Sequence, residues 1–347
     1  MLTLHHNRCM TNLNGCVELS GLETWRVVGS DARTFLHGQL TQDVALLKAD
    51  QARWSAYCSP KGRALANCLV QQAEAGSETD LWLTLPADLS ETTLKRLRMF
   101  VMRAKCTFEV QSDWQVWGVT GNCIPTELPK AIWSRWVDHT QSRVWVRLPA
   151  ATLLPDDLIA LDTDEESPEV ARALCWTRSC STLFQDTPLS SDVWKWLEIM
   201  AAQPWVTLQL RELFIPQMLN LESIGGVNFK KGCYPGQEVV ARSQFRGAVK
   251  RKTSRIRFEI DSMDEVFQHT HPFPELMDPV TGDVIGEVYL TAQHPCRMHQ
   301  VDALSIVPID WTLSSEHPDQ FHAILRWKHH DVPVQHIGLP YLIRQDL

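Results

Sequence analysis

The chain has 347 residues, of which 44% are hydrophobic, and a formal net charge of −8 at pH 7. Its length predicts two or three domains, and its composition is typical of a globular protein. Proteins that bind RNA or DNA over a long surface are usually basic, so the acidic balance restricts any nucleic-acid contact to a local stretch.

The sequence contains no run of about 18 apolar residues, so we expect no transmembrane helix. Residues 1–16 lack the apolar core and the cleavage pattern of a signal peptide, which predicts a cytoplasmic protein without membrane contact. The ten cysteines are scattered without Cys-x-x-Cys spacing, so we expect no bound metal and mostly buried, reduced thiols. Because no heptad repeat or apolar edge is visible, we expect a monomer.

Hydrophobic periodicity predicts an α+β fold with antiparallel sheets for the first part of the chain. In chain order, strands are expected at 25–28, 52–58, 63–70, 81–85, 106–110, 115–119 and 143–148. Helices are expected at 31–40, 90–102, 191–202 and 236–245. The stretches 120–142 and 162–190 are expected to be rich in loops, and 214–231 to be an ordered loop.

The pattern changes near residue 251. Short strands are expected at 254–260, 284–292, 302–307 and 322–327, separated by turns and without a long helix. This pattern predicts a small all-β domain, either a barrel or a sandwich. We therefore expect the domain boundary to separate residues 1–250 from residues 251–347.

One compact motif, KKGCYPGQE at 230–238, combines residues that suit a reactive thiol. Cys233 lies beside two lysines, between two glycines and just before a predicted helix. Positive charge and a helix N-terminus lower the pKa of a thiol, and glycines leave the sulfur open to approach. The alternative interpretation is a glycine-rich turn with an incidental cysteine.

The same stretch is locally basic. It carries a single carboxylate, on Glu238, and six cations, on Lys230, Lys231, Arg242, Arg246, Lys250 and Arg251. A weak tRNA contact along this stretch is therefore an alternative function, and it would depend steeply on salt.

Several blocks of sequence within residues 20–251 point to a known family. They are FLHGQLTQDV at 35–44, PKGR at 60–63, FIPQMLNLE at 214–222, GG at 225–226, KKGCYPGQE at 230–238, AR at 241–242 and FRG at 245–247. In these blocks the chain resembles the YgfZ family of folate-binding proteins, a branch of the superfamily of the glycine-cleavage T-protein. The T-protein is an aminomethyltransferase that uses tetrahydrofolate.

The resemblance implies a three-domain ring around a folate-sized channel. Two interleaved antiparallel α+β domains would be followed by a C-terminal six-stranded β-barrel. The implied role is folate-dependent support of iron–sulfur proteins, including the radical enzyme that methylthiolates tRNA. Folate or tetrahydrofolate would be the cofactor, and those iron–sulfur proteins would be the partners.

The resemblance also implies a set of site residues. The functional thiol would be Cys233, with Lys231, Tyr234, Gln237 and Glu238 around it. Folate contacts are expected from Trp194, Trp25, Lys230, Asn220 and Glu222. Trp194 matches a tryptophan that the family associates with folate, although its place on the apolar stripe of its helix also fits a core residue. The family's other folate tryptophan matches Leu22, so Trp25 would substitute only with a shifted strand register.

The chain departs from the T-protein pattern in two places. The catalytic aspartate of the T-protein falls on Ala66 or Asn67, neither of which carries a carboxylate. This change argues against an active aminomethyltransferase or demethylase, which stays open as the alternative function. A glutamate and a glycine of the family fall on Met200 and Ala202, which puts one polar folate contact in doubt.

Overall fold

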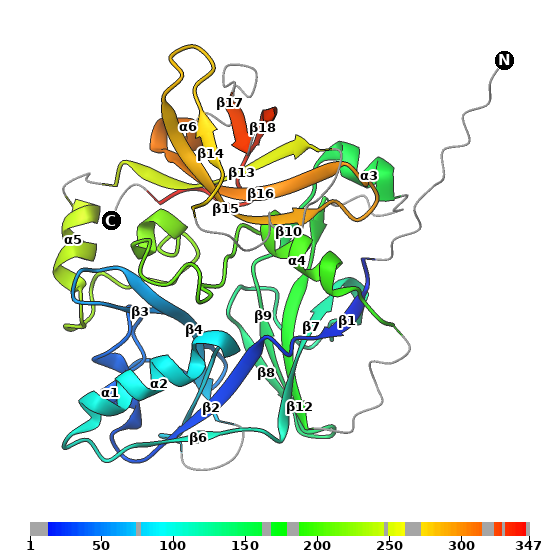
Figure 1. Cartoon of the computed structure of the whole chain (residues 1–347). Coiled ribbons are helices and arrows are strands. Elements are labelled where there is room, and N and C mark those ends of the chain that lie inside the picture. Colours follow the sequence, from blue (N-terminus) through cyan, green and yellow to red (C-terminus); the bar gives the residue numbers. More distant parts are fainter. Residues whose placement is uncertain are drawn as a thin grey trace.

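The structure is a computed structural model that describes residues 13–73, 78–161, 168–178, 187–245, 249–260, 272–313, 323–327 and 330–344. It contains two five-stranded antiparallel sheets and a closed six-stranded barrel (Figure 1). The barrel lies above the two sheets in this view, and α4 lies between the barrel and the second sheet. Within the described residues, no helix combines the length and hydrophobicity needed to cross a membrane.

The first sheet carries two helices on one face. Its strand order is β3-β4-β5-β2-β6, with bounds Ala52–Cys58, Ala64–Gln72, Leu81–Pro86, Leu22–Val28 and Thr107–Val110. Helices α1 (Ala32–His37) and α2 (Ala87–Val101) pack on this sheet through Leu36, Leu94 and Leu97, which are fully buried. The predicted strands and both helices are thus confirmed, although α1 ends three residues earlier than expected.

The second sheet has the order β1-β7-β12-β9-β8. The strands span Gly15–Glu18, Trp114–Thr120, Arg172–Arg178, Arg143–Arg147 and Arg135–Asp138. The expectation of loops at 120–142 and 162–190 is wrong for β8 and for the central strand β12. Six of the seven β12 residues are buried, so the strand lacks the polar–apolar alternation that identifies a strand in sequence. The short strands β10 (Ala151–Thr152) and β11 (Glu169–Val170) form a separate pair.

Helix α4 (Ser191–Met200) joins the second sheet to the barrel. Its N-cap is Ser190, whose hydroxyl accepts a hydrogen bond from the Asp192 backbone N–H at 3.2 Å. The main hydrophobic core includes residues of both sheets, of α4 and of the barrel. Trp54 lies in this core, stacked on Trp133 at 5.4 Å between ring centroids and edge-on to Trp205 at 4.4 Å. These three tryptophans therefore fill a large part of this core.

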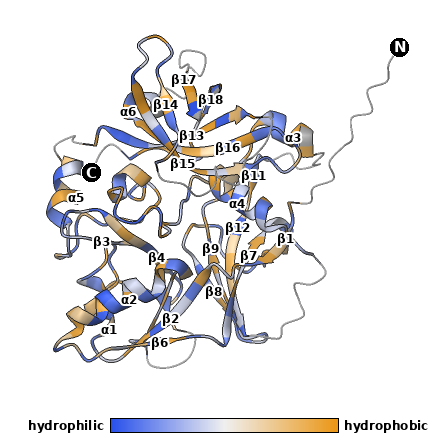
Figure 2. Cartoon of the chain, viewed as in Figure 1, coloured by the Kyte–Doolittle hydropathy of each residue, from blue (hydrophilic) through white to orange (hydrophobic). Residues whose placement is uncertain are grey.

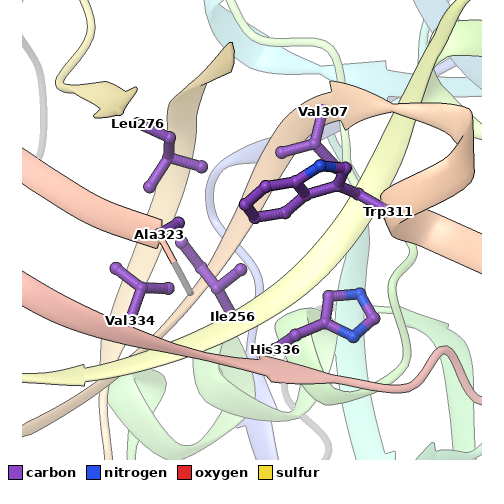
Figure 3. A pocket seen from close by; sticks show the side chains of 7 residues that line it. All are labelled: Ile256, Leu276, Val307, Trp311, Ala323, Val334 and His336. Carbon is purple, nitrogen blue, oxygen red and sulfur yellow. The ribbon is translucent and has the colours of Figure 1, made fainter. Parts of the chain in front are cut away.

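The C-terminal domain is a closed six-stranded barrel, as the resemblance implied, and its strand order is β13-β16-β15-β14-β17-β18. Its strands are Arg251–Glu259, Gln300–Pro308, Val284–Gln293, Glu275–Met277, Ala323–Trp327 and His330–Ile337, with α6 at Ile309–Leu313. Figure 2 shows hydrophobic and hydrophilic residues mixed along the barrel strands. Strand β14 has only three residues and β18 contains a proline, so neither was predicted. The barrel interior leaves about 10 Å³ between Ile256, Trp311 and their neighbours (Figure 3), which is room for one water molecule.

A buried ionic network ties the barrel to the rest of the molecule. Arg257 of β13 pairs with Asp302 of β16 at 2.7 Å and with Asp157 of α3 (Pro155–Leu161) at 2.9 Å. Asp302 also accepts a hydrogen bond from the Trp196 indole of α4 at 2.7 Å. The guanidinium of Arg255 donates to the carbonyl of Met200 at 2.6 Å. Because each charge is paired or hydrogen-bonded, this network can stay buried.

Candidate functional site

The loop that carries Cys233 lies at the surface just before α5 (Gln237–Phe245). Among the cysteines in the described part of the chain, Cys233 alone is exposed at the surface, and the others are buried or partly buried. Cys58, Cys68 and Cys175 are buried, and burial raises the pKa of each of these thiols. The structure thus presents Cys233 to solvent, whereas these three thiols are inert core residues.

The buried side chain of Lys231 holds this loop in place. Its side chain is buried, and its Nζ donates hydrogen bonds to the carbonyl of His37, at the end of α1, and to that of Leu40 at 2.6 Å. The ammonium also lies 4.8 Å from the centre of the Tyr234 ring. Burial lowers the pKa of Lys231 to about 8, while the nearby Asp43 and Cys233 oppose this shift. The main role of Lys231 is therefore structural, because its hydrogen bonds connect the Cys233 loop to the segment at the end of α1.

This pKa shift predicts a pH dependence of stability. Between about pH 8 and pH 10.5 the unfolded chain binds more protons at Lys231 than the folded chain does. The free energy of unfolding should therefore rise with pH across this window, by up to about 3 kcal/mol. Urea unfolding at several pH values should show this rise for the natural chain relative to Lys231→Met. Parallel pH profiles for the two proteins would contradict the assignment.

The other residues of the motif divide between core and solvent. Tyr234 is buried, and burial raises the pKa of its phenol. The carbonyl of Tyr234 accepts from the backbone N–H of Gln237 at 3.2 Å, which closes the turn into α5. Glu238 is exposed and pairs with Arg242 one helical turn later. Cys233 is thus flanked by a buried anchor on each side.

Gly236 lets this loop lie directly on the turn between β3 and β4. Gly236 has φ +80°, and a Cβ atom there would lie 2.3 Å from the carbonyl oxygen of Ser59 and 2.8 Å from the Cα atom of Gly62. Gly62 is equally confined, because a Cβ atom on it would lie 2.7 Å from Val239. A side chain at either position would collide with the facing segment, so this close approach of the two loops requires both glycines.

His37 and Asp43 also border the loop, and the sequence interpretation did not include them in the site. Nδ1 of His37 lies 3.2 Å from a carboxylate oxygen of Asp43. A Cβ atom on Gly232 would lie 3.5 Å from Nε2 of the same histidine, so the imidazole lies alongside the residue that precedes Cys233. Both residues belong to the FLHGQLTQDV block, and this block was the feature of the sequence that could have placed them in the site.

The FLHGQLTQDV block also forms hydrogen bonds with the glycine pair Gly225–Gly226. The hydroxyl of Thr41 donates to the carbonyl of Gly226 at 2.6 Å, and the amide of Gln42 donates to that of Gly225 at 2.5 Å. The backbone N–H of Asn228 donates to the Thr41 carbonyl at 2.9 Å. These contacts bring together blocks of sequence that lie more than 180 residues apart.

Asn220 and Glu222, two of the predicted folate contacts, are buried against the barrel. Asn220 follows the 3-10 helix η3 (Pro216–Leu219) with φ 54°, and its amide donates to the carbonyl of Thr253 at 2.9 Å. Glu222 forms an ion pair with Lys252 of β13, and neither side chain is more than 4% exposed. Burial raises the pKa of the Glu222 carboxyl, and Lys252 opposes this shift. Both residues connect this segment to the barrel.

Trp194 is 3% exposed and lies in the main core. Its ring packs against Gly118, where a Cβ atom would lie 2.6 Å from the indole, and the Arg172 guanidinium lies 4.8 Å from the ring centre. Leu22 packs against the same core. The structure thus brings the two positions that match the family's folate tryptophans to one core.

Trp25 and Lys230 lie elsewhere. Trp25 packs against the core under α2, with the Arg98 guanidinium 5.3 Å from its ring. It is therefore on the opposite face of β2 from Leu22, without the register shift that a substitution would require. Lys230 is exposed, and its backbone N–H donates to the side chain of Asn228 at 2.8 Å.

The basic stretch is less available to an anion than its composition indicates. Lys231 is buried, and Arg242 is paired with Glu238. Lys230, Lys250 and Arg251 are exposed, whereas Arg246 lies outside the described residues.

The positions that depart from the T-protein pattern have structural partners. Asn67 is fully buried, its amide donates to the Pro204 carbonyl at 2.8 Å, and its oxygen accepts from the Val206 N–H at 2.8 Å. The side chain thus fastens β4 to the segment after α4. Ala202 has φ 46°, and its carbonyl accepts from the Tyr341 hydroxyl at 2.9 Å.

A hollow of about 460 Å³ opens between the second sheet, the loop at 223–224 and the C-terminal tail. Its wall includes two cationic side chains, Lys130 and Arg147, and one carboxylate, Glu169, together with Ser223 and Tyr341. None of the residues predicted for the folate site lines it, although Asn220 reaches the Tyr341 hydroxyl at 3.4 Å. Within the described residues, no group of three or more His, Cys, Asp or Glu side chains is placed to hold a metal ion.

Comparison with known proteins adds a fold and a family. The solved aminomethyltransferase T of the glycine cleavage system from Bartonella henselae superposes with a TM-score of 0.65, at 14% identity, over 95% of this chain and 87% of its own. This likeness concerns the fold. No family model matches the chain.

Curated relatives are closer in sequence. The tRNA-modifying protein YgfZ of Cronobacter sakazakii is 31% identical over 245 residues, covering 67% of this chain and 69% of the relative. Its counterpart in Yersinia pestis (strain Pestoides F) is 32% identical over 243 residues, covering 67% and 68%. The α+β domains, the closed barrel and this level of identity lead to one conclusion: the chain belongs to the YgfZ family and has the fold of the glycine-cleavage T-protein.

Proposed function

We propose that this protein is a folate-binding accessory protein in tRNA modification. Its Cys233 thiol would support iron–sulfur enzymes such as a radical tRNA methylthiotransferase. The relatives that share its sequence are named as tRNA-modifying proteins. The proposal places the protein in the cytoplasm as a monomer, with folate and the iron–sulfur enzyme as its partners.

The observation that carries the proposal is the exposure of Cys233 on a loop that is firmly held. Lys231 and Tyr234 are buried on either side of it, and Gly236 fixes the turn that follows. A soft sulfur that reaches solvent from a rigid support is suited to transient contact with iron or sulfur of a partner. The His37–Asp43 pair lies beside the same loop.

Folate is the ligand that the T-protein-like fold suggests. The hollow beside Tyr341, at about 460 Å³, falls within the usual range for small-molecule sites. Lys130 and Arg147 in its wall suit the carboxylates of the folate glutamate tail. A tryptophan fluorescence titration with folate and tetrahydrofolate tests the ligand. Saturable quenching in the natural chain, weakened in Arg147→Met, is expected, and an unchanged spectrum would exclude folate.

A folate-dependent aminomethyltransferase or demethylase is the second candidate, and the surroundings of Asn67 argue against it. Asn67→Asp would restore a carboxylate but would lose the donor to the Pro204 carbonyl and bury a charge. We expect this variant to lose about 2–4 kcal/mol of unfolding free energy and to gain no turnover of methylated amines with tetrahydrofolate. Urea unfolding and an amine-turnover assay check the two parts. A stable, active Asn67→Asp protein would favour the transferase.

The proposed role is tested in a bacterial strain that lacks its own YgfZ family protein. Methylthiolated nucleosides in total tRNA should be low in this strain and should return when the present chain is expressed. Normal levels of other tRNA modifications serve as the internal control. Failure to restore methylthiolation, with the protein present and folded in the cell extract, would contradict the proposal.

A further inference from the structure

A second group of thiols lies far from the Cys233 loop in the sequence, on the face of the second sheet opposite α4. Cys16 in β1 and Cys175 in β12 are buried in a small hydrophobic cluster on this face. Cys123, in the 3-10 turn η1 (Gly121–Cys123) after β7, packs against the same cluster and is partly exposed. Strands β1, β7 and β12 are adjacent in the sheet (Figure 1).

Several contacts bring Cys16 and Cys123 together. The Cys16 thiol lies close enough to the Thr187 hydroxyl and to the Cys123 thiol for both to influence its pKa. The Cys123 sulfur lies 3.7 Å from the same Thr187 hydroxyl. The backbone N–H of Cys16 donates to the Thr187 carbonyl at 2.9 Å, which fixes the position of this threonine. Two sulfurs therefore converge on one hydroxyl group.

The backbone around η1 holds this arrangement in place. The side chain of Asn14 accepts a hydrogen bond from the backbone N–H of Asn122 at 2.7 Å. Asn14 stands two residues before Cys16, and Asn122 stands one residue before Cys123. Gly15 pairs with Thr120 in the sheet, and the Gly15 N–H also donates to the threonine hydroxyl at 3.1 Å. The two cysteines thus lie on backbone segments that are directly hydrogen-bonded to each other.

We propose that Cys16 and Cys123 form an intramolecular disulfide when the protein meets a peroxide. Cys123 reacts first because it is the partly exposed residue of the pair, whereas Cys16 is 3% exposed. The Cys123 sulfur attacks one peroxide oxygen, and the O–O bond breaks. One water molecule is released, and Cys123 becomes a sulfenic acid. The Cys16 sulfur then attacks the Cys123 sulfur, an S–S bond forms, the S–O bond breaks, and a second water leaves. The two thiols lose two electrons and two protons, and the peroxide is reduced.

Cys16 takes the second, resolving step because of its position beside Cys123. Burial, and next the neighbouring Cys123, raise the pKa of the Cys16 thiol to about 12, so this thiol does not itself react readily with a peroxide. The bond would join the edge strand β1 to the turn after β7. It is independent of the function proposed for Cys233, which lies in a different part of the fold.

The test uses the full chain with Cys233→Ser, so that the exposed thiol cannot form mixed disulfides. The protein is treated with hydrogen peroxide, unfolded, alkylated and digested, and the peptides are analysed by mass spectrometry. We expect a dithiothreitol-sensitive cross-link between the Cys16 and Cys123 peptides, at least roughly tenfold more abundant than any other cysteine pair. Adding Cys123→Ser should remove the cross-link and leave Cys16 open to alkylation after unfolding.

Cys175→Ser is the matched control, because Cys175 lies in the same cluster without an exposed sulfur. This variant should form the Cys16–Cys123 cross-link as fully as the parent protein. Accumulation of sulfinic acid on Cys123 without a cross-link would overturn the proposal. So would a predominant cross-link from Cys123 to a different cysteine.

Discussion

Replacing Lys252 with methionine is expected to lower the free energy of unfolding by about 3–5 kcal/mol. Methionine keeps most of the volume of lysine but removes the charge that pairs with Glu222. The Glu222 side chain is fully buried in the folded protein, so the variant must leave a carboxylate without its ion-pair partner or protonate it. Lys252 also reaches the Gln217 carbonyl at 3.4 Å. Urea unfolding at neutral pH measures the loss.

The double variant Lys252→Met/Glu222→Leu separates the loss of the pair from the cost of a single buried charge. Removing both charges should recover most of the stability, because well-packed apolar residues often replace a buried ion pair at little cost. A single variant within about 1 kcal/mol of the natural chain would show that water reaches Glu222. Glu222 would then be a better candidate for ligand contact than its burial indicates.

Gly236→Ala is expected to destabilise the protein by about 3–4 kcal/mol. Part of this cost comes from the left-handed backbone, with φ +80°, which a residue with a Cβ atom adopts at about 1–2 kcal/mol. The rest comes from overpacking, because the new methyl group would lie 2.3 Å from the Ser59 carbonyl. Relief of this clash would push the Cys233 loop away from the β3–β4 turn.

Gly282→Ala is the matched control for Gly236→Ala. Gly282 has a similar φ of +74°, but nothing lies within 4 Å of the position that its Cβ atom would occupy. Its substitution should cost only about 1 kcal/mol, which is the conformational part. Denaturant midpoints of the two variants give the comparison. Equal losses would mean that the contact between Gly236 and the β3–β4 turn is not tight.

The sequence was sufficient where local signals and the overall fold agree. The α5 helix follows a glycine and a proline and carries Glu238 in its first turn, so its start was predictable. The barrel was predictable from four strands and the family resemblance, although β14 and β18 were not. Strand β12 was missed because it is buried on both faces and therefore shows no alternation.

The candidate site was harder to predict, because its geometry depends on residues that are distant in the sequence. Lys231 stands two residues from Cys233, but its side chain turns to the carbonyls of His37 and Leu40, which lie more than 190 residues earlier. Asn220 and Glu222 similarly meet barrel residues more than 25 positions later. Spacing within a motif shows which groups are present, whereas tertiary contacts decide which of them remain exposed.

The most direct test of the central claim is the amount of methylthiolated nucleoside in tRNA from cells whose only YgfZ family protein carries Cys233→Ser. Cys296→Ser, at a partly exposed thiol of the barrel, is the control. We predict that the Cys233 variant reduces methylthiolation at least roughly tenfold, as loss of a working thiol does, while the control restores it fully. Full restoration by a folded Cys233→Ser protein would show that this thiol is not the working group.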